Sequence, residues 1–211
     1  MDKITALLFD IDGTVLDTSE FIIQATEHAL AELGYLVPER SVIRKNVGKA
    51  FPDYYFSLTG SHKDTEKLIG IHREFQYSNF HLAKLFPNAL NVLKALKQKG
   101  YKMAAVTTRS KKTSIQTLVD NNIFELFNVV ISNEDATELK PHTAPLLKAL
   151  EYLNGAPNKA IMIGDSHLDI EAGKNAGTKT IRAVYGFHKD NLNNPQPDFI
   201  IDNIKDLLTL L

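Results

Sequence analysis

Short apolar runs that alternate with amphipathic segments of helix length limit the possible folds of this chain more than any other feature. The first run, residues 4–9, stops at Asp10, and its length suits a buried strand better than a helix. Strands that alternate with helices predict a parallel sheet covered by helices. The further runs, each short and rich in β-branched or aromatic residues, are residues 101–106, 128–131, 160–163, 180–184 and 199–201.

The segment after Pro87 is the clearest predicted helix. Its apolar residues follow the spacing i, i+3, i+4, i+7, and Gly100 stands where a helix-ending C′ glycine is expected. Pro145 begins a second such segment, and a third follows Asp165. From residue 83 onward the order strand, loop, helix repeats, which predicts a doubly wound, Rossmann-like α/β sheet. The apolar positions of the first helix are Ala89, Val92, Leu93 and Leu96.

Residues 18–82 interrupt this order with helix signals alone. The first of these helices begins at a predicted N-cap, Thr18 or Ser19. We therefore expect a small all-helical cap domain at residues 18–82, inserted into an α/β core domain formed by residues 1–17 and 83–211. The first cap helix is predicted to stop at Gly34, others lie around residues 39–46, 51–58 and 64–80, and the connectors are residues 15–17 and 82–87.

Charge and composition argue against several classes of protein. The 24 Lys and Arg residues nearly balance 25 Asp and Glu residues, the net charge is -1, and 44% of the residues are hydrophobic. These values disfavour a nucleic-acid-binding chain and a disordered one. Without cysteine the chain forms neither a disulfide nor a thiolate metal site. With no signal-peptide pattern and no apolar run of about 18 residues, we expect a cytoplasmic protein without a membrane partner. We also expect a monomer or a homodimer.

Residues 191–197, rich in Asn and Pro, are expected to form a surface turn.

Two acidic pairs follow predicted strands. In an extended strand, residues i and i+2 project to the same side, so Asp10 and Asp12 would lie together where the first strand ends. Two close carboxylates either share a proton or bind a cation. Gly13 permits a tight turn and the close approach of a ligand, and Thr14 offers an amide and a hydroxyl. The alternative for this stretch is an Asx turn that ends the strand.

Asp165 and Asp169 form the second pair, after the apolar run at residues 160–163. Oxygen-rich acidic sites without His or Cys favour Mg²⁺, which keeps several waters and uses one or two carboxylates together with substrate phosphate. Magnesium is therefore the predicted ion. Asp169 by itself could instead cap the following helix or compensate its dipole.

Thr107, Thr108 and Lys140 supply hydroxyl donors and a cation at the ends of other predicted strands. A carboxylate about 3.5 Å from a phosphate dianion meets a repulsion on the order of 9 kcal/mol at an effective dielectric of about 20, so its attack needs fixed cations. Each residue by itself also fits a plainer role, the threonines as caps and the lysine in a solvated loop. Their order and spacing together favour a phosphate site.

Taken together, these motifs resemble the haloacid dehalogenase superfamily of phosphohydrolases, specifically members with a small helical cap inserted after the first motif. The resemblance implies that Asp10 is a nucleophile that forms an aspartyl-phosphate. It also implies that Asp12 protonates the leaving oxygen and later activates water. The matching stretches are Asp10-Ile-Asp12-Gly13-Thr14, the strand-terminal Thr107, Lys140-Pro141, and the run from Gly164 to Gly177 with Asp165 and Asp169.

The resemblance assigns the remaining site residues as well. Mg²⁺ would be held by the Asp10 carboxylate, the main-chain carbonyl of Asp12 and Asp165, with Asp169 in or next to the coordination shell. Thr107 and Lys140 would bind phosphoryl oxygens. The chain departs from the family pattern at Thr108, where many relatives have Asn, and at Thr143, where a second Pro is usual.

Substrate choice is expected to lie in the cap. Residues 43–49 resemble the loop with which relatives contact the rest of the substrate, and Gly48 and Lys49 are the predicted contacts. A cation at Lys49, or alternatively at Arg44, would suit a carboxylate or a second phosphate, as in phosphoglycolate or pyrophosphate. We therefore expect a phosphatase similar to phosphoglycolate phosphatases that acts on a small phosphorylated metabolite.

Other functions remain open at this stage. Within the same family, the alternatives are an inorganic pyrophosphatase, a sugar-phosphate phosphatase and a phosphoglucomutase. Because Asp12 is present, phosphate-ester chemistry is favoured over dehalogenation. The non-enzymatic alternative is a phospho-accepting receiver-like signalling module, and the position of Asp10 after the first strand argues against it.

Overall fold

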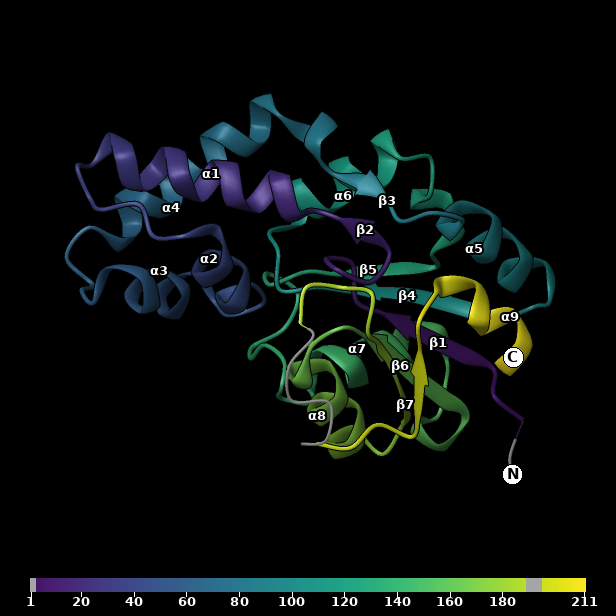
Figure 1. The fold of residues 1–211 in the computed structure, drawn as a ribbon. Coiled ribbons are helices and arrows are strands. Elements are labelled where there is room, and N and C mark those ends of the chain that lie inside the picture. Colours follow the sequence, from purple (N-terminus) through teal and green to yellow (C-terminus); the bar gives the residue numbers. More distant parts are fainter. Residues whose placement is uncertain (1–2, 189–194) are drawn as a thin grey trace.

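The computed structural model describes residues 3–188 and 195–211, and most of the predicted surface turn at residues 191–197 lies outside them. In the described part of the chain, six parallel strands form one sheet in the order β5-β4-β1-β6-β7-β8 (Figure 1). This confirms the predicted doubly wound α/β sheet. The strands are β1 (Ala6–Phe9), β4 (Lys102–Val106), β5 (Val129–Ile131), β6 (Ala160–Gly164), β7 (Lys179–Ala183) and β8 (Phe199–Ile201).

Helices cover both faces of the sheet, so its central strands are apolar without alternation. On β1, Leu7 and Phe9 face a cluster that includes helices α5 and α9, whereas Ala6 and Leu8 face a cluster built largely on α7. All four residues are buried. The core helices are α5 (Ala89–Gln98), α6 (Lys111–Asp120), α7 (Ala144–Leu153), α8 (His167–Ala176) and α9 (Leu207–Leu210).

The ends of the core helices follow the sequence signals. Gly100 adopts φ 90° just beyond α5, and Pro145 occupies the first turn of α7. Helix α6 falls in the helix-length segment expected between residues 101–106 and 128–131, although its bounds were not predicted, and α9 was not predicted. Short 3-10 turns complete the described chain at Phe80–Leu82, Phe124–Leu126, Pro157–Lys159 and Ile204–Asp206.

Four helices make up the cap segment, by which we mean residues 18–82. They gather at one end of the molecule, away from both chain termini (Figure 1). A separate apolar cluster, with Phe21, Leu30, Tyr55 and Leu68 among its buried members, holds them together. These helices are α1 (Ser19–Glu32), α2 (Arg40–Asn46), α3 (Phe51–Thr59) and α4 (Thr65–Ser78). They lie within one or two residues of the predicted helices.

Both connectors to the cap segment contain a short strand that the sequence did not predict. β2 (Leu16–Asp17) pairs with β3 (Lys84–Leu85) in an antiparallel two-stranded ribbon. Thr18 does occupy the N-cap position of α1, but its side chain makes no capping hydrogen bond. Its hydroxyl instead donates to Asp12 Oδ1 at 2.7 Å. The predicted N-cap position of Thr18 is thus confirmed, but its hydroxyl is directed toward Asp12 and does not accept a hydrogen bond from the first turn of α1.

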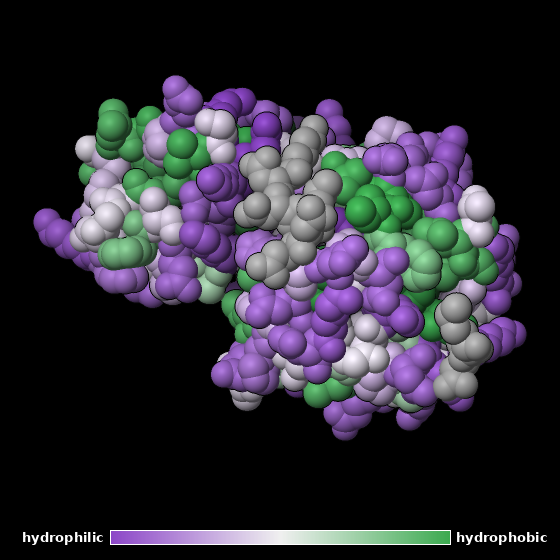
Figure 2. Space-filling view, turned by 60° about the horizontal axis from the view of Figure 1, so that its bottom comes forward, coloured by the Kyte–Doolittle hydropathy of each residue, from purple (hydrophilic) through white to green (hydrophobic). Residues whose placement is uncertain are grey.

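The surface view shows two lobes joined by a narrower region, with hydrophilic residues over most of this face and apolar patches on both lobes (Figure 2). None of the helices in the described ranges is long and apolar enough to cross a membrane.

Candidate active site

The candidate site lies beyond the carboxyl ends of three neighbouring strands. β1 is flanked by β4 and β6, so Asp10, Thr107 and Asp165 follow adjacent strands. The chain continues from β1 toward β4 on one side, and β6 lies on the other side. β1 and β6 therefore form a topological switch point, the place where open α/β sheets bind ligands.

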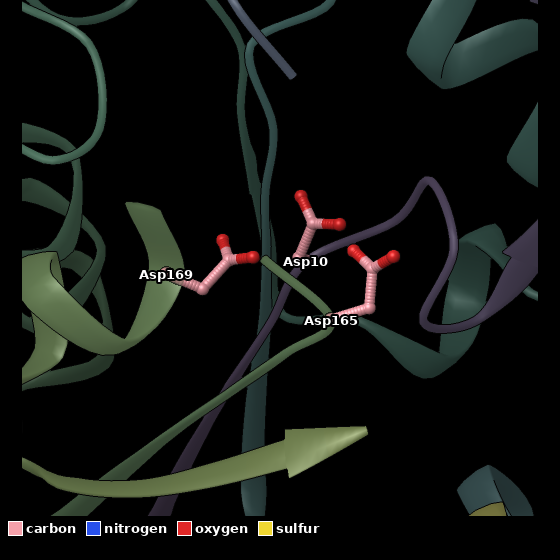
Figure 3. Close-up of side chains that lie close together, drawn as sticks. All are labelled: Asp10, Asp165 and Asp169. Carbon is pink, nitrogen blue, oxygen red and sulfur yellow. The ribbon is translucent and has the colours of Figure 1, made fainter. Parts of the chain in front are cut away.

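Three buried carboxylates meet here. Asp10, Asp165 and Asp169 each present an oxygen within 4.8 Å of the others (Figure 3). The ammonium of Lys140 lies 2.6 Å from Asp10 Oδ1 and 2.6 Å from Asp169 Oδ1, and it also donates to the carbonyl of Val106 at 3.0 Å. One cation thus bridges two of the three carboxylates, as the predicted joint placement of Asp10, Asp169 and Lys140 requires.

Burial shifts the pKa values of these three carboxyl groups. It raises the pKa of Asp10 well above its usual range, although the Lys140 charge opposes the shift. Burial, reinforced by the charge of Asp169, raises the pKa of Asp165 to about 7. Burial would also raise the pKa of Asp169, but Lys140 and hydrogen bonds from Ser166 bring it below the usual value. When ionised, the three carboxylates outnumber the single lysine that binds them, and this favours a further cation.

The donor set fits a hard divalent cation. It consists of carboxylate oxygens, without sulfur or imidazole among the three clustered residues, which suits Mg²⁺. Asp165 is fixed by the amides of Phe187 and His188, which donate to its Oδ2 at 2.6 and 3.3 Å. A Cβ at Gly13, whose φ is 84°, would lie 2.4 Å from the same oxygen. Only glycine leaves room there for the carboxylate.

Asp12 lines the same pocket as Asp10 but has different partners. Its Oδ1 accepts hydrogen bonds from Thr18 Oγ1 at 2.7 Å and from Arg109 Nη1 at 3.3 Å. Arg109 also donates through Nη2 to the Thr113 carbonyl at 2.8 Å, and its guanidinium lies 4.9 Å from the centre of the Phe21 ring. Asp12 is therefore held by one residue at the base of the cap segment and one from the core.

The predicted hydroxyl residues divide between the pocket and its surroundings. Thr108 lines the pocket. Thr107 is 3% exposed, and its Oγ1 accepts from the Arg109 amide at 3.2 Å. Gly13 packs against Asp165, as described above. Thr14 is fully buried, its hydroxyl has no partner among the described residues, and its carbonyl accepts from Tyr185 at 2.8 Å. Thr14 thus supports the turn, and contact with substrate stays a prediction.

Comparison with known proteins places this geometry in a family. Residues 7–183 match the model of the haloacid dehalogenase-like hydrolases. The chain belongs to this family. A curated relative, the pyrophosphatase PpaX of Bacillus mycoides, is 33% identical over 99% of this chain and 97% of its own length.

Solved structures of similar proteins agree with this assignment. A haloacid dehalogenase-like hydrolase from Streptococcus pneumoniae, SP0104, has a TM-score of 0.90 at 27% identity over 100% of this chain and 99% of its own. A predicted phosphoglycolate phosphatase from Haemophilus somnus also has a TM-score of 0.90, at 23% identity over 100% and 99% of the two chains, and supports the fold alone. The predicted family and fold are confirmed, and the chain is an enzyme of the phosphatase class within the haloacid dehalogenase-like hydrolases.

In this haloacid dehalogenase-like hydrolase, Asp169 caps its helix, the plainer of the two roles that the sequence left open, and it also binds the site lysine, whereas its place at the metal ion stays a prediction. Its Oδ2 accepts from the amide and hydroxyl of Ser166 at 3.0 and 2.6 Å, which completes a capping box at the start of α8. Its Oδ1 binds Lys140. One carboxylate therefore starts the helix and positions the site lysine. A Cβ at Gly164 would lie 2.4 Å from Asp169 Oδ2, so the end of β6 must be glycine.

The cap segment supplies the opposite wall of the pocket. Gly48 and Lys49, the predicted substrate contacts, line it. Lys49 is exposed, and its ammonium donates to Asn46 Oδ1 at 2.7 Å and to Ser57 Oγ at 2.9 Å, both within the cap segment. Its contact with substrate stays a prediction.

Sequence reasoning missed several lining residues. Arg109 directly follows the Thr107-Thr108 pair, so its position was a usable signal. On α4 the buried stripe of Leu68 and Ile69 continues into two polar residues, His72 and Gln76, and this break in an apolar pattern was the second signal. Further residues on the cap side of the pocket are Ile22, Val47, Phe51 and Tyr54.

Proposed function

We propose that this hydrolase is a Mg²⁺-dependent phosphatase that acts on a small phosphorylated metabolite through an aspartyl-phosphate on Asp10. The observation that supports it best is the placement of the Asp10 carboxylate at 2.6 Å from a fixed lysine, beside two more buried carboxylates, in the pocket that Asp12 also lines. A nucleophile, a proton-transfer group and a cluster of carboxylates suited to a cation thus lie in one cavity.

The proposed reaction has two steps. In the first, an oxygen of Asp10 attacks phosphorus, the bond from phosphorus to the leaving oxygen breaks, and Asp12 gives that oxygen a proton. In the second, Asp12 takes a proton from a water molecule that attacks phosphorus, and the bond to Asp10 breaks to release phosphate. Lys140 holds Asp10 in position for both steps and offsets the charge of the incoming phosphoryl oxygens.

Asp10, Asp165 and the main-chain carbonyl of Asp12 would hold the magnesium ion, with Asp169 beside them. When bound, it would supply the second positive charge that a carboxylate needs in order to approach a phosphate dianion. Binding would also relieve the repulsion among the three carboxylates, which Lys140 alone does not balance.

Two substrates are the strongest candidates. Pyrophosphate is supported by the relatives at 33% identity, which are named pyrophosphatase PpaX. Phosphoglycolate was the first expectation from the sequence, and a sugar phosphate remains the alternative within the family. The cytoplasmic location and the monomeric or homodimeric state expected from the sequence stay predictions, and so does the domain boundary at residues 17/18 and 82/83.

Phosphate release from a panel of small phosphate esters and pyrophosphate, with MgCl₂ and then with EDTA, tests the proposal. We expect multiple turnovers that need the ion, and a raised thermal unfolding midpoint when Mg²⁺ is added to the free protein, because a ligand that binds only the folded state stabilises it. The absence of turnover on every substrate, or turnover undiminished by EDTA, would refute the assignment.

A further inference from the structure

His72 is a buried polar residue of the pocket that the proposed reaction does not use. It lies on α4, is 1% exposed and lines the pocket from the cap side. Its Nδ1 is 2.8 Å from the hydroxyl of Tyr55, whereas its Nε2 is buried and has no hydrogen-bond partner in the described ranges. The ring packs edge-on against Phe51 with 4.9 Å between ring centres. A buried nitrogen without a partner is costly, so a bound group that satisfied it would gain affinity.

The Tyr55 hydroxyl fixes the tautomer of this imidazole. Tyr55 is fully buried, and burial raises the pKa of its phenol, so the proton stays on oxygen. When the phenol donates to Nδ1, the ring proton of the neutral imidazole lies on Nε2, and this tautomer is part of the proposal below. Burial, together with the charges of Arg109 and Arg73, lowers the pKa of His72 to about 3, which keeps the ring neutral. In this tautomer the buried Nε2 without a partner is an N–H donor, on a residue that lines the pocket.

Arg109 adds a second donor to the same cavity. Its Nη1 and Nη2 are bound to Asp12 and Thr113, but its Nε is buried without a partner in the described ranges. The cap residues that line the pocket include no carboxylate. This side thus offers donors and a positive charge, the opposite of the acidic cluster on Asp10, Asp165 and Asp169.

We propose that the Nε2–H of His72, positioned by Tyr55, and the guanidinium of Arg109 form a leaving-group subsite that binds anionic oxygens, either a carboxylate or a second phosphoryl group. The inference rests on the proposed phosphatase function and adds what the substrate must carry beyond the reacting phosphate. Tyr55 is a positioning residue, because it acts through the tautomer of His72.

Matched substrates test the subsite directly. Phosphoglycolate is compared with 2-hydroxyethyl phosphate, and pyrophosphate with methyl phosphate, so that each pair differs in the anionic group of the leaving part. We expect His72→Phe to lower the preference for the anionic member, measured as the ratio of kcat/KM values, by about 10- to 100-fold, the value of a hydrogen bond to a charged group. His72→Gln, which keeps an N–H donor, should restore part of that preference.

The control is His62→Phe, an exposed cap histidine stacked on Phe56 outside the pocket, which should leave the preference unchanged. If His72→Phe fails to fold, the double variant Tyr55→Phe/His72→Phe replaces it, because it removes both hydrogen-bonding partners and leaves no orphaned hydroxyl. A loss of preference for phosphoglycolate alone assigns the subsite to a carboxylate, and a loss for pyrophosphate alone assigns it to a second phosphoryl group.

Nitrogen NMR of the His72 ring gives a readout that a purely structural role would not move. We expect the Nε2–H tautomer in the wild type and a mixture of tautomers in Tyr55→Phe. An Nδ1–H tautomer in the wild type, or equal losses on charged and neutral leaving groups in His72→Phe, would overturn the subsite while leaving the phosphatase intact. A wild-type protein inactive on every phosphate ester would overturn both.

Discussion

The two walls of the pocket, one from the core and one from the cap segment, differ in the chemical character of their side chains. The core wall holds Asp10, Asp165, Asp169 and Lys140, all buried and ionisable, with each carboxyl group held by a lysine or by main-chain amides. The cap wall is mainly apolar and aromatic, and the group most deeply buried there, His72, is kept neutral. The charged wall lies at the ends of strands, whereas the neutral wall lies on helices of a separate apolar cluster.

This contrast separates reaction from selection. Charged groups gain their effect only where they are held in place, and the ends of paired parallel strands fix them on several sides. The cap wall, which has no carboxylate among its lining residues, excludes water and distinguishes leaving groups without adding negative charge near the acidic cluster. Changes on the core wall should therefore alter turnover of every substrate, whereas changes on the cap wall should alter the ratio between substrates.

The largest expected effect comes from Asp10→Asn. The amide is a poor nucleophile, so turnover of every substrate should fall by at least about a thousandfold. The fold should persist, since a charge leaves a crowded cluster with Asp165 and Asp169. Initial rates and thermal unfolding of both proteins check this, and a variant with the wild-type rate would remove the basis of the mechanism.

Lys140→Met should cause the largest loss of stability. It leaves the buried carboxylates of Asp10 and Asp169 without their shared cation, which costs about 3–5 kcal/mol in comparable buried pairs. The matched control is Lys67→Met in the cap segment, where the pair with Asp64 is exposed and is worth less than about 1 kcal/mol. Urea unfolding measures the change in unfolding free energy for both variants. Equal losses would show that the buried pairs of Lys140 stabilise the fold no more than the exposed pair of Lys67.

Lowering the pH should reduce the stability of the protein through His72, whose ring is neutral in the folded state. The pKa of His72 is about 3 in the folded protein, below its unfolded value of about 6.5. Between these values the unfolded chain binds a proton that the folded chain does not. The contribution to stability is therefore present above about pH 6.5 and falls by up to about 1.4 kcal/mol per pH unit as the pH drops toward 3.

Unfolding free energies of the wild type and His72→Phe at pH 7 and pH 5 isolate this contribution. The carboxylates respond to acid in both proteins, so the difference between the two slopes belongs to His72. We expect the shallower slope in His72→Phe, and parallel slopes would show that the ring takes a proton in the folded state.

The smallest expected effect belongs to Lys49→Ala. The ammonium of Lys49 is exposed and already binds Asn46 and Ser57, so we expect its removal to change kcat/KM on any acidic substrate by at most about threefold. The same substrate pairs used for His72 measure it. A change in preference larger than that of His72→Phe would move the selective contact from α4 to the residue 43–49 loop.

The sequence was sufficient for the parts of the molecule with strong periodicity. The six strands lie within about two residues of their predicted bounds. Runs such as residues 6–9 and 160–163 are buried on both faces of the sheet, and their unbroken apolar sequence indicates a buried strand. The ribbon of β2 and β3 was missed because two-residue strands carry no periodic signal. The bounds of helix α6 were not predicted, although Ser110, whose hydroxyl oxygen accepts from the Thr113 amide, marks its start.

The site was only partly predictable for a similar reason. Asp10 and Asp165 come directly after β1 and β6, so the strand order brings them together. Lys140, which was expected at a strand end, lies instead in the loop between β5 and α7, and Asp169 lies in the first turn of α8. Arg109 carried a local signal beside Thr107 and Thr108, and His72 carried one in the buried stripe of α4, but their contacts with the pocket arise from packing between segments far apart in the sequence.

The ribbon of β2 and β3 has a consequence for how this chain can change. Leu16 lies opposite Leu85 and Asp17 opposite Lys84, so the chain leaves the sheet and returns to it at neighbouring points. An inserted segment of any length begins and ends at these two neighbouring points. It therefore adds no strain to the strands of the six-stranded sheet. The ribbon is thus a suitable position at which to replace the cap segment by one of different substrate specificity while the core site stays unchanged.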